Sequence, residues 1–337
     1  MRVPRNRNGL GVKLGAAGLS AVLVALLVIL VASVGVKSAG GAEGAKLNLG
    51  ILFLGGSTHL YAAKKLGLFD QEKLDVDLKS LGGGAQVVPL IVSGDIDVGM
   101  VNQVSWLLAL AQGYDLVAVS SVSKERSKEP FANNLYVRAD SPIRTAKDLE
   151  GKRVATNTLN NIVTIYVNGW MRKNGADSSK VQWAEVPFPQ MPDTVLNNRV
   201  DAAFIVEPFG TILRNTGKSR TLASPIAEMY PRGLFFSVLA AKRSWLDKHQ
   251  DEASRLVKAL QRATDRVMGD QKLRLELMTE FTKMSPDLVR QLVVDDHDIR
   301  IDMGALALTM DLMMRDGLLK QKLPLEKYVW KDAPLVN

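Results

Sequence analysis

Glycine, hydroxyl and amide residues gather where a predicted strand gives way to a predicted helix. In open α/β sheets small molecules bind beyond the carboxyl ends of the strands, where loops and helix N-termini converge. Helix N-termini offer unpaired N–H groups that suit a sulfonate, nitrate, phosphate or carboxylate, and hydroxyl and amide side chains add directional hydrogen bonds. We therefore expect a binding site for a small polar or anionic molecule among Gly56, Ser57, Thr58, Gly83, Gly84, Asn102, Gln103, Thr156, Asn157, Asn160, Asn161 and Glu207.

Several of these residues also have a purely structural explanation. Ser57, Thr58 and Asn160 have the side chains of helix N-caps, and the glycine run at 82–84 could form only a sharp turn. A carboxylate at Glu207 would repel an anion, but it could bind an ammonium or hydroxyl group or make structural hydrogen bonds. The sequence leaves these alternatives open.

Histidine is sparse, and His59 falls near the predicted site, one turn into a helix. We treat His59 as a candidate ligand contact and expect His249 and His297 to lie on the surface. No two histidines have the spacing of a zinc-binding helix motif. We therefore predict no metal site.

The chain holds no cysteine, no phosphate-binding Gly-x4-Gly-Lys-Ser/Thr motif and no Gly-x-Ser-x-Gly elbow. The sequence therefore excludes disulfides and a lipid-accepting cysteine, and it shows no motif for nucleophilic catalysis. We predict no catalytic residue and no cofactor. The formal net charge is +8, but residues 1–42 contribute five positive charges and no negative ones, which leaves +3 on the rest. Because no basic run with interleaved aromatics is present, we expect no nucleic-acid partner.

The elements that must position the site alternate from residue 47 onward between short β-like runs and amphipathic helical stretches. This is the pattern of parallel sheets joined by βαβ units. Beyond about residue 240 the chain is mostly helical, with a Met-rich stripe over 303–314 that we interpret as core packing. The expected strands are 47–54, 76–81, 97–101, 116–122, 134–137, 153–155, 181–186, 201–206 and 234–240.

Two helix boundaries and one internal similarity add detail. A helix over 161–173 has Asn160 as its N-cap candidate, and Ser285 and Pro286 open another helix. Segments 92–99 and 196–203 each close a helix and enter a strand through an aspartate. This weak internal similarity indicates two similar lobes.

The first 42 residues have the layout of a secretory signal. Basic residues up to Lys13 precede an apolar run over 14–36, and small residues follow at 38–42. The run is also just long enough to cross a bilayer as a helix, so an uncleaved anchor with its basic end in the cytoplasm stays open. We expect cleavage near Ala42. In either case the body is exported to the periplasm or the outer face of the cytoplasmic membrane.

Four stretches carry a family resemblance. They are YAAKKLGLF at 61–69 with LDV at 74–76, SGDIDVG at 93–99, SPI at 141–143 with DLEGK at 148–152, and VDAAF at 200–204 with EP at 207–208. In their order and spacing, over residues 47–319, they resemble the periplasmic substrate-binding proteins for nitrate, aliphatic sulfonates, taurine and pyrimidine precursors of thiamine. At 156–161, where many relatives have a small Gly-Ser turn, this chain has the bulkier TNTLNN.

The resemblance implies a type II periplasmic-binding-protein clamshell with a ligand cleft between two α/β lobes. Lobe 1 would comprise residues 43–134 and 237–337, and lobe 2 the inserted residues 135–236, with two crossing strands as the hinge. The implied function is that of the solute-binding component of an ATP-binding-cassette importer. Its partners would be a sulfonate-, nitrate- or taurine-like solute or a pyrimidine precursor, and a permease with its cytoplasmic ATPase.

Two other functions stay open at this stage. A membrane-anchored sensor would report occupancy of the site to another protein. An enzyme of the thiamine-pyrimidine or menaquinone pathway would share the fold, but it would need a cytoplasmic location and a catalytic set of His, Cys or Lys residues. We expect a monomeric binding protein rather than an enzyme.

Overall fold

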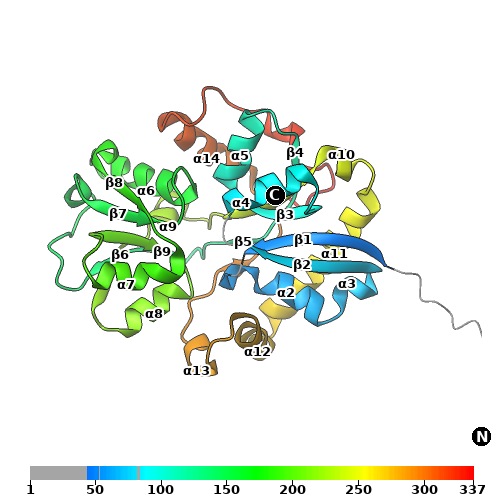
Figure 1. Ribbon diagram of the computed structural model, residues 1–337, viewed down its shortest axis with the longest axis horizontal. Coiled ribbons are helices and arrows are strands. Elements are labelled where there is room, and N and C mark those ends of the chain that lie inside the picture. The colour runs from blue at the N-terminus through cyan, green and yellow to red at the C-terminus, as the bar shows by residue number, and fades with distance from the viewer. Residues whose placement is uncertain (1–43, 53, 82–83) are drawn as a thin grey trace, which may run out of the picture. The chain divides into compact units, whose positions relative to one another are not determined.

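The computed structural model describes residues 44–52, 54–81 and 84–337. The predicted signal or anchor segment and Gly83 therefore lie outside the described residues. Two five-stranded sheets form the framework, each covered by helices (Figure 1). Within the described ranges no helix is both long and apolar enough to cross a membrane.

The first sheet has the strand order β2-β1-β3-β11-β4. Its strands are β1 (Ala45–Leu52), β2 (Leu74–Leu81), β3 (Val98–Asn102), β4 (Leu116–Ser121) and β11 (Ser237–Lys242). β1 is parallel to β2 and β3, whereas β11 is antiparallel to β3 and β4. The three strands β3, β11 and β4 are almost entirely buried, as expected for strands covered on both faces.

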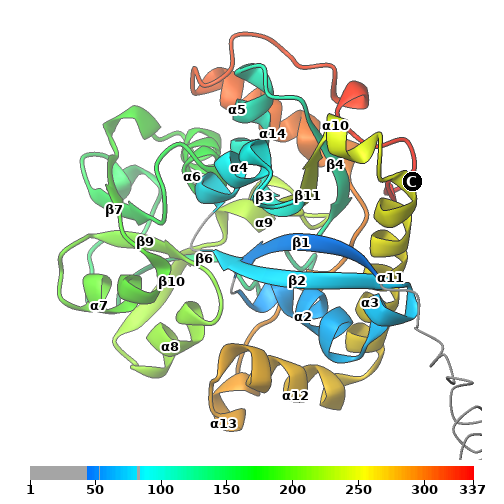
Figure 2. The ribbon, with the colours of Figure 1, turned by 45° about the vertical axis from the view of Figure 1, so that its right-hand side comes forward.

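Helices cover the first sheet on both faces. α2 and α3 lie on one side of β1 and β2, and α4 lies on the other (Figures 1 and 2). The helices of this part are α2 (Thr58–Lys65), α3 (Leu68–Gln71), α4 (Gly84–Ser93), α5 (Gln103–Ala111), α10 (Arg243–Leu246), α11 (Gln250–Gly269), α12 (Gln271–Thr282), α13 (Pro286–Val289) and α14 (Met303–Arg315). The chain end thus returns to the lobe in which the described chain begins.

The second sheet has the order β10-β6-β9-β7-β8. β7 is parallel to β8 and β9, while β6 is antiparallel to β9 and β10. Its strands are β6 (Asn134–Arg138), β7 (Arg153–Thr156), β8 (Gln182–Glu185), β9 (Ala202–Ile205) and β10 (Ser219–Ala223). Its helices are α6 (Ile162–Lys173), α7 (Met191–Leu196), α8 (Phe209–Asn215) and α9 (Pro225–Met229).

Both sheets are mixed, which corrects the prediction of parallel sheets. The reversed strands are β6 in the second sheet and β11 in the first. Each of them follows a crossing of the chain between the sheets: β4 to β6 is the first crossing and β10 to β11 is the second. The two crossings lie side by side, because the Phe236 N–H donates to the Ser123 carbonyl at 3.1 Å and the Glu125 N–H donates to the Leu234 carbonyl at 2.7 Å. This pairing also explains why β11 begins at Ser237 rather than at residue 234. The two residues Ser123 and Lys124 form β5, which pairs with β12 (Asp296–His297).

The two aspartates noted in the sequence occupy equivalent positions in the two sheets. The Asp97 carboxylate accepts the Asn48 N–H at 2.7 Å while the Asp97 N–H donates to the Asn48 carbonyl at 3.0 Å. Asp201 makes the same pair with Arg153, at 2.8 and 2.9 Å. Each aspartate joins the start of one parallel strand to its neighbour, which confirms the internal similarity.

Helix α14 ties the two sheets together from the first lobe. Its Met-rich stripe is core packing, as predicted, since Leu306, Met310 and Met313 are all buried. α14 contacts both α5 and α6, and its Thr309 hydroxyl lies 2.9 Å from the Tyr166 hydroxyl of α6. The predicted opening of a helix at Ser285 is also confirmed, since its hydroxyl accepts the Leu288 N–H at 3.3 Å.

Gly99 allows α4 to pack directly on β3. A Cβ at Gly99 would lie 2.9 Å from Ile91 Cδ1 and nearer still to Val87 Cγ1, and both of these side chains are fully buried. We expect Gly99→Ala to lower the free energy of unfolding by about 1–3 kcal/mol through overpacking. Urea unfolding measures the loss. Gly269→Ala is the control, because nothing lies within 4 Å of its Cβ position; equal midpoints for the two variants would contradict the packing argument.

Candidate functional site

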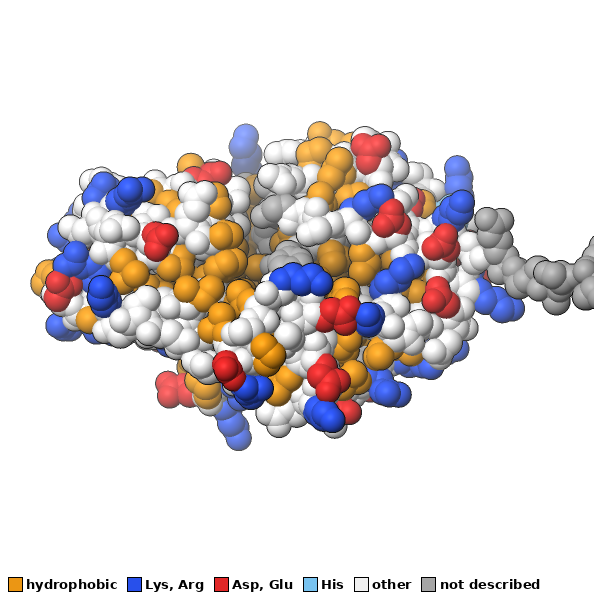
Figure 3. Space-filling view, turned by 60° about the horizontal axis from the view of Figure 1, so that its bottom comes forward, with side chains coloured by type: hydrophobic (Ala, Val, Ile, Leu, Met, Phe, Trp, Pro, Cys, Tyr) orange, Lys and Arg blue, Asp and Glu red, His pale blue; other side chains and the backbone are white. Residues whose placement is uncertain are grey.

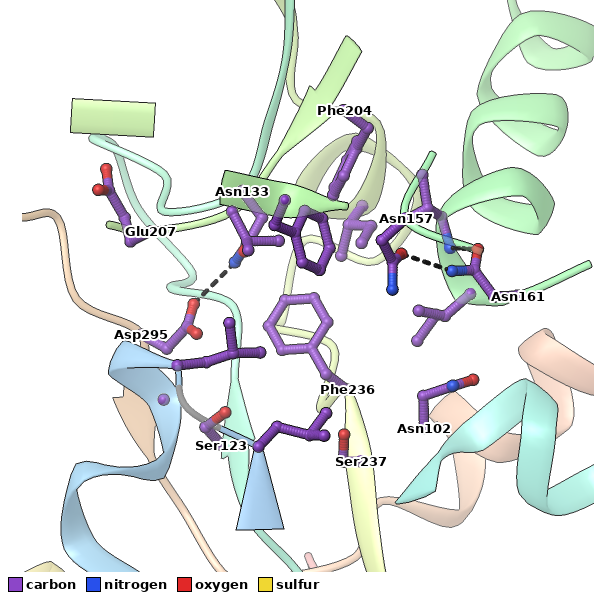
Figure 4. A pocket seen from close by; sticks show the side chains of 18 of the residues that line it. Asn102, Ser123, Asn133, Asn157, Asn161, Phe204, Glu207, Phe236, Ser237 and Asp295 are labelled. Atoms are coloured by element: carbon purple, nitrogen blue, oxygen red, sulfur yellow. Dashed lines mark hydrogen bonds between the residues drawn. The ribbon is translucent and has the colours of Figure 1, made fainter. Parts of the chain in front are cut away.

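A cavity with about 690 Å³ of empty space, part of it open to solvent, lies between the two sheets. Its wall includes residues at or just beyond the carboxyl ends of β1, β3, β7 and β9, where the fold class places ligands. Segments next to the two crossings complete it (Figure 4). The lining residues are Leu52, Leu54, Gly56, Met100, Asn102, Ser123, Asn133, Asn157, Asn161, Ile162, Val163, Phe188, Phe204, Val206, Glu207, Ile226, Phe236, Ser237 and Asp295.

The middle of the cavity is apolar. Phe188, Phe204 and Phe236 contribute rings from the second lobe and from the second crossing. In Figure 4 the rings of Phe204 and Phe236 stand between the polar side chains at the two ends of the cavity. Aromatic walls of this kind bury a flat or hydrocarbon body, while a few polar groups fix its orientation.

One end of the cavity is an amide end, formed by Asn102, Asn157 and Asn161. Asn102 is the N-cap of α5, and its side-chain oxygen accepts the Ser105 N–H at 3.0 Å. Asn161 donates from Nδ2 to Asn157 Oδ1 at 2.7 Å, so the two side chains hold each other at the cavity wall. The amide end therefore joins two helix N-termini, from α5 in one lobe and α6 in the other.

Asn161, rather than the predicted Asn160, caps α6. Its side-chain oxygen accepts the N–H groups of Val163 and Thr164, and the Thr164 hydroxyl accepts the Asn161 N–H in return. Asn160 instead adopts a left-handed backbone with φ of 52°, a conformation that asparagine tolerates better than most residues. The true cap thus lies one residue further along the chain than the sequence predicts.

Asn161→Ala is expected to weaken both the helix and the site. Loss of an N-cap costs about 0.5–2 kcal/mol, and Asn157 loses the partner that orients it. Urea unfolding and solute affinity measured on the same sample test both effects. Asn160→Gly is the matched control, because glycine tolerates the left-handed backbone at this position and both bonds stay in place. A larger loss of affinity in this variant would contradict the assignment.

The opposite end of the cavity is acidic. Asn133 Nδ2 donates to Asp295 Oδ1 at 2.8 Å and to Glu125 Oε2 at 2.9 Å, and so bridges two carboxyl groups (Figure 4 shows the first bond). Glu125 also accepts the N–H groups of Arg126, Ala132 and Asn133. Ser123 presents its hydroxyl beside Asp295. We call Ser123, Glu125, Asn133 and Asp295 the acidic end.

Burial governs the titration of these carboxyl groups. It raises the pKa of Asp295 well above its usual range, and repulsion from Glu125, Glu207 and Asp296 adds to the shift against the Asn133 hydrogen bond. Burial also raises the pKa of Glu125, although its backbone and Asn133 hydrogen bonds oppose the change. The carboxyl groups of the acidic end therefore hold protons more readily than exposed carboxyl groups do, unless a bound cation stabilises their negative charge.

Glu207 lines the cavity, but its carboxylate already has partners. Oε1 accepts from Arg214 at 2.7 Å and Oε2 accepts the Thr211 N–H at 3.1 Å. Figure 4 shows the carboxylate turned away from the phenylalanine rings. Burial raises the pKa of Glu207, and Arg214 opposes that shift. Of the two roles open for Glu207, the structure displays the structural hydrogen bonds.

Several predicted site residues do not line the cavity. Ser57, Thr58, Gln103 and Thr156 are buried with internal partners: Met100 for Ser57, the Gly55 carbonyl for Thr58, Phe235 and Thr309 for Gln103, and Thr158 and Asn161 for Thr156. Gly84 begins α4, and Asn160 faces two other surface hollows. Gly56, Asn102, Asn157, Asn161 and Glu207 are the predicted residues that the fold brings to the cavity.

His59 and His297 form a buried pair outside the cavity lining. Their ring centroids lie 4.7 Å apart. The expectation that His297 lies on the surface is wrong, since it is only 4% exposed in the short strand β12. Burial, with repulsion from His297, holds the pKa of His59 well below its usual value, and burial lowers the pKa of His297 to about 4. Among the described residues, no three His, Asp or Glu side chains are grouped as metal ligands would be.

The sequence profile of the family described as NMT1/THI5 like matches residues 56–272. This chain belongs to that family. The Bacillus subtilis (strain 168) protein YtlA is similar to this NMT1/THI5-like chain, with 22% identity over 236 residues, 68% of this chain and 69% of YtlA. The Saccharomyces cerevisiae 4-amino-5-hydroxymethyl-2-methylpyrimidine phosphate synthase THI11 is 27% identical over 95 residues. That match spans 28% of this chain and 27% of the synthase, about a quarter of its length.

Among solved structures, this NMT1/THI5-like chain is similar to the periplasmic aliphatic sulphonate binding protein SsuA from Escherichia coli. The TM-score is 0.72 with 19% sequence identity, and the match covers 86% of this chain and 98% of SsuA. At this identity the likeness establishes the fold. The chain thus has the two-lobed architecture of periplasmic binding proteins that the sequence predicts.

Proposed function

We propose that this protein is the exported solute-binding component of an ATP-driven importer. It captures one small solute in the cavity between its lobes and delivers it to a permease. The main support for this proposal is that the cavity wall is divided between the two lobes, with Asn102 on one and Asn157 on the other. A solute that contacts both walls stabilises the closed arrangement, because those contacts exist only when the lobes meet.

The proposed lobes are residues 43–134 with 237–337, and 135–236. The paired crossings near Ser123 and Phe236 are the proposed hinge. Structures that resemble the chain come from binding proteins, such as the sulphonate-binding SsuA. The solute classes that follow from this relationship are sulfonates, nitrate, taurine-like molecules and pyrimidine precursors.

A synthase role is the alternative raised by the similarity to the yeast enzyme. The described residues that line the cavity include no histidine, lysine or cysteine, and the buried pair His59 and His297 is not part of the wall. The described wall therefore lacks the lysine that Schiff-base chemistry needs and a histidine or cysteine for nucleophilic catalysis, while its aromatic and amide groups support binding and orientation. Binding is therefore the function we propose.

The absence of cysteine from the chain allows a direct test of lobe closure. Tyr114 in the first lobe and Leu159 in the second are 42% and 46% exposed and border one surface hollow. Spin labels on Tyr114→Cys with Leu159→Cys report the distance between the lobes. We expect a solute found by thermal-shift screening to change this distance. The screen covers sulfonates, nitrate, carboxylates, pyrimidines and amines.

The matched control places both labels in one lobe, on Tyr114→Cys with Met268→Cys, which is 41% exposed. Its distance stays constant when solute binds. If a solute binds tightly and the inter-lobe distance is unchanged, the protein does not work as a clamshell. If no solute class stabilises the chain, the importer role fails.

A further inference from the structure

The charge of the cavity wall points to the charge of the solute. Among the described lining residues, Glu207 and Asp295 are acidic and none is lysine, arginine or histidine. Glu207 is paired with Arg214. Asp295 has no cation within salt-bridge distance among the described residues, and Glu125, Glu207 and Asp296, which act on its carboxyl group through their charge, are acidic. Any cationic partner for Asp295 would therefore come from the solute.

Two hydroxyl groups in the cavity wall, one of them beside this carboxyl group, also lack partners. Ser123 and Ser237 are each 3% exposed and line the cavity, and among the described residues no hydrogen bond reaches either hydroxyl. A Cβ at Gly56 would lie 2.5 Å from Ser123 Oγ and 2.9 Å from Asp295 Oδ2. The glycine therefore leaves open the spot on which both oxygens converge. Two acceptors around one opening suit a group with several N–H donors.

The rest of the cavity determines the shape of such a solute. The rings of Phe188, Phe204 and Phe236 fill the middle, and an aromatic face attracts a nearby cation. The amide end adds Asn102 and Asn161, the N-caps of α5 and α6, together with Asn157, and it can hold a neutral or negative polar group. The cavity is thus acidic at one end, apolar between, and amide-lined at the other.

We propose that the solute carries a protonated amine or amidinium group, bound by Asp295 and Ser123, on a flat or apolar body held between the phenylalanines. This inference rests on the proposed binding function and narrows it. An oxyanion at the acidic end would be buried among carboxyl groups without a counter-charge, which disfavours it strongly. Specificity thus arises from repulsion of anions as well as from attraction of the cation.

Probes of one shape and different charge test the proposal. Benzylamine and benzamidine are cations at neutral pH, benzyl alcohol is neutral, and phenylmethanesulfonate is an anion. Calorimetric titration of the full chain is expected to show at least about tenfold tighter binding of each cation than of the sulfonate, a difference of about 1.4 kcal/mol. Asp295→Asn should remove this preference for the cations over the sulfonate.

Asp296→Asn is the matched control, because it removes the neighbouring carboxylate, which does not line the cavity. It should keep the preference for cations. The proposal is overturned if the sulfonate binds as tightly as the cations, if no cation binds, or if Asp295→Asn retains the preference. If phenylmethanesulfonate changes the inter-lobe distance, this inference is wrong but the clamshell function still holds. Should Asp295→Asn misfold, Ser123→Ala tests the same end and should weaken the binding of the cations more than that of the sulfonate.

Discussion

Arg214→Met is expected to lower the free energy of unfolding by about 3–5 kcal/mol at pH 8, the range found when one partner of a buried ion pair is removed. Arg214 donates to Glu207 at 2.7 Å and to the hydroxyls of Thr211 and Tyr136 at 2.5 Å each. The Glu207 side chain is only 4% exposed. Without the guanidinium this carboxylate would remain buried without a counter-charge.

The loss should depend on pH in a predictable direction. Burial raises the pKa of Glu207 and Arg214 holds it down, so removing Arg214 raises that pKa further. Below this pKa the Glu207 carboxyl group takes up a proton, and the penalty for burying its charge disappears. The difference between wild type and Arg214→Met is therefore expected to shrink as the pH falls from 8 towards 4, measured by urea unfolding at each pH.

Two variants separate this explanation from a simple loss of packing. Arg214→Met combined with Glu207→Gln should recover part of the stability at pH 8, because the unpaired charge is gone. Arg290→Met removes an exposed partner of Asp287 and should leave stability unchanged. A loss for Arg214→Met that is equal at pH 8 and pH 4 would mean that Glu207 is not the cause.

Asp295→Asn is expected to make the protein more stable than wild type at pH 8 while it impairs the binding of cations. Burial raises the pKa of Asp295 well above its usual range, with repulsion from Glu125, Glu207 and Asp296. Between the unfolded pKa of about 4 and the raised folded pKa, the native state binds more protons than the unfolded state. The contribution of Asp295 to stability is therefore full below about pH 4 and is lost as the pH rises through the folded value.

The difference between the two proteins isolates this carboxyl group from the others. Asp298, for example, has a pKa of about 2, held there by Arg300 and Lys124 against burial, and its contribution is lost only in acid. The free-energy difference between Asp295→Asn and wild type should grow with pH by about 1.4 kcal/mol for each unit by which the pKa is raised. Asparagine keeps an oxygen for the Asn133 bond, so a constant difference across pH would rule out titration of Asp295 as the source.

A carboxyl group that reduces stability in the empty protein is understandable at a binding site. The solute would supply the positive charge that the acidic end lacks. Binding of this solute would lower the pKa of Asp295, and it would also stabilise the closed form. On the face shown in Figure 3, basic and acidic side chains are interspersed rather than gathered by sign. The charge selectivity proposed for the cavity therefore depends on its local wall and not on a charged surface.

The sequence alone was sufficient for much of the fold. The alternation of β-like and helical runs predicted both α/β lobes, because burial of one face imposes a period on each element. Asp97 and Asp201 revealed the repeated strand entry. The position of Asn102, Asn157, Asn161 and Glu207 after strands was enough to bring them to the cavity, since the carboxyl ends of parallel strands meet at one edge.

Only the tertiary structure decided the acidic end and the direction of individual side chains. Asn133 and Asp295 are bonded to each other although 162 positions separate them in the chain. Both lie in irregular segments near the crossings, where no periodic pattern marks a residue as facing a site. Gln103 and Ser57 follow strands as Asn102 does, yet they turn into the core, because a loop's backbone angles, rather than its place in the sequence, set where each side chain points.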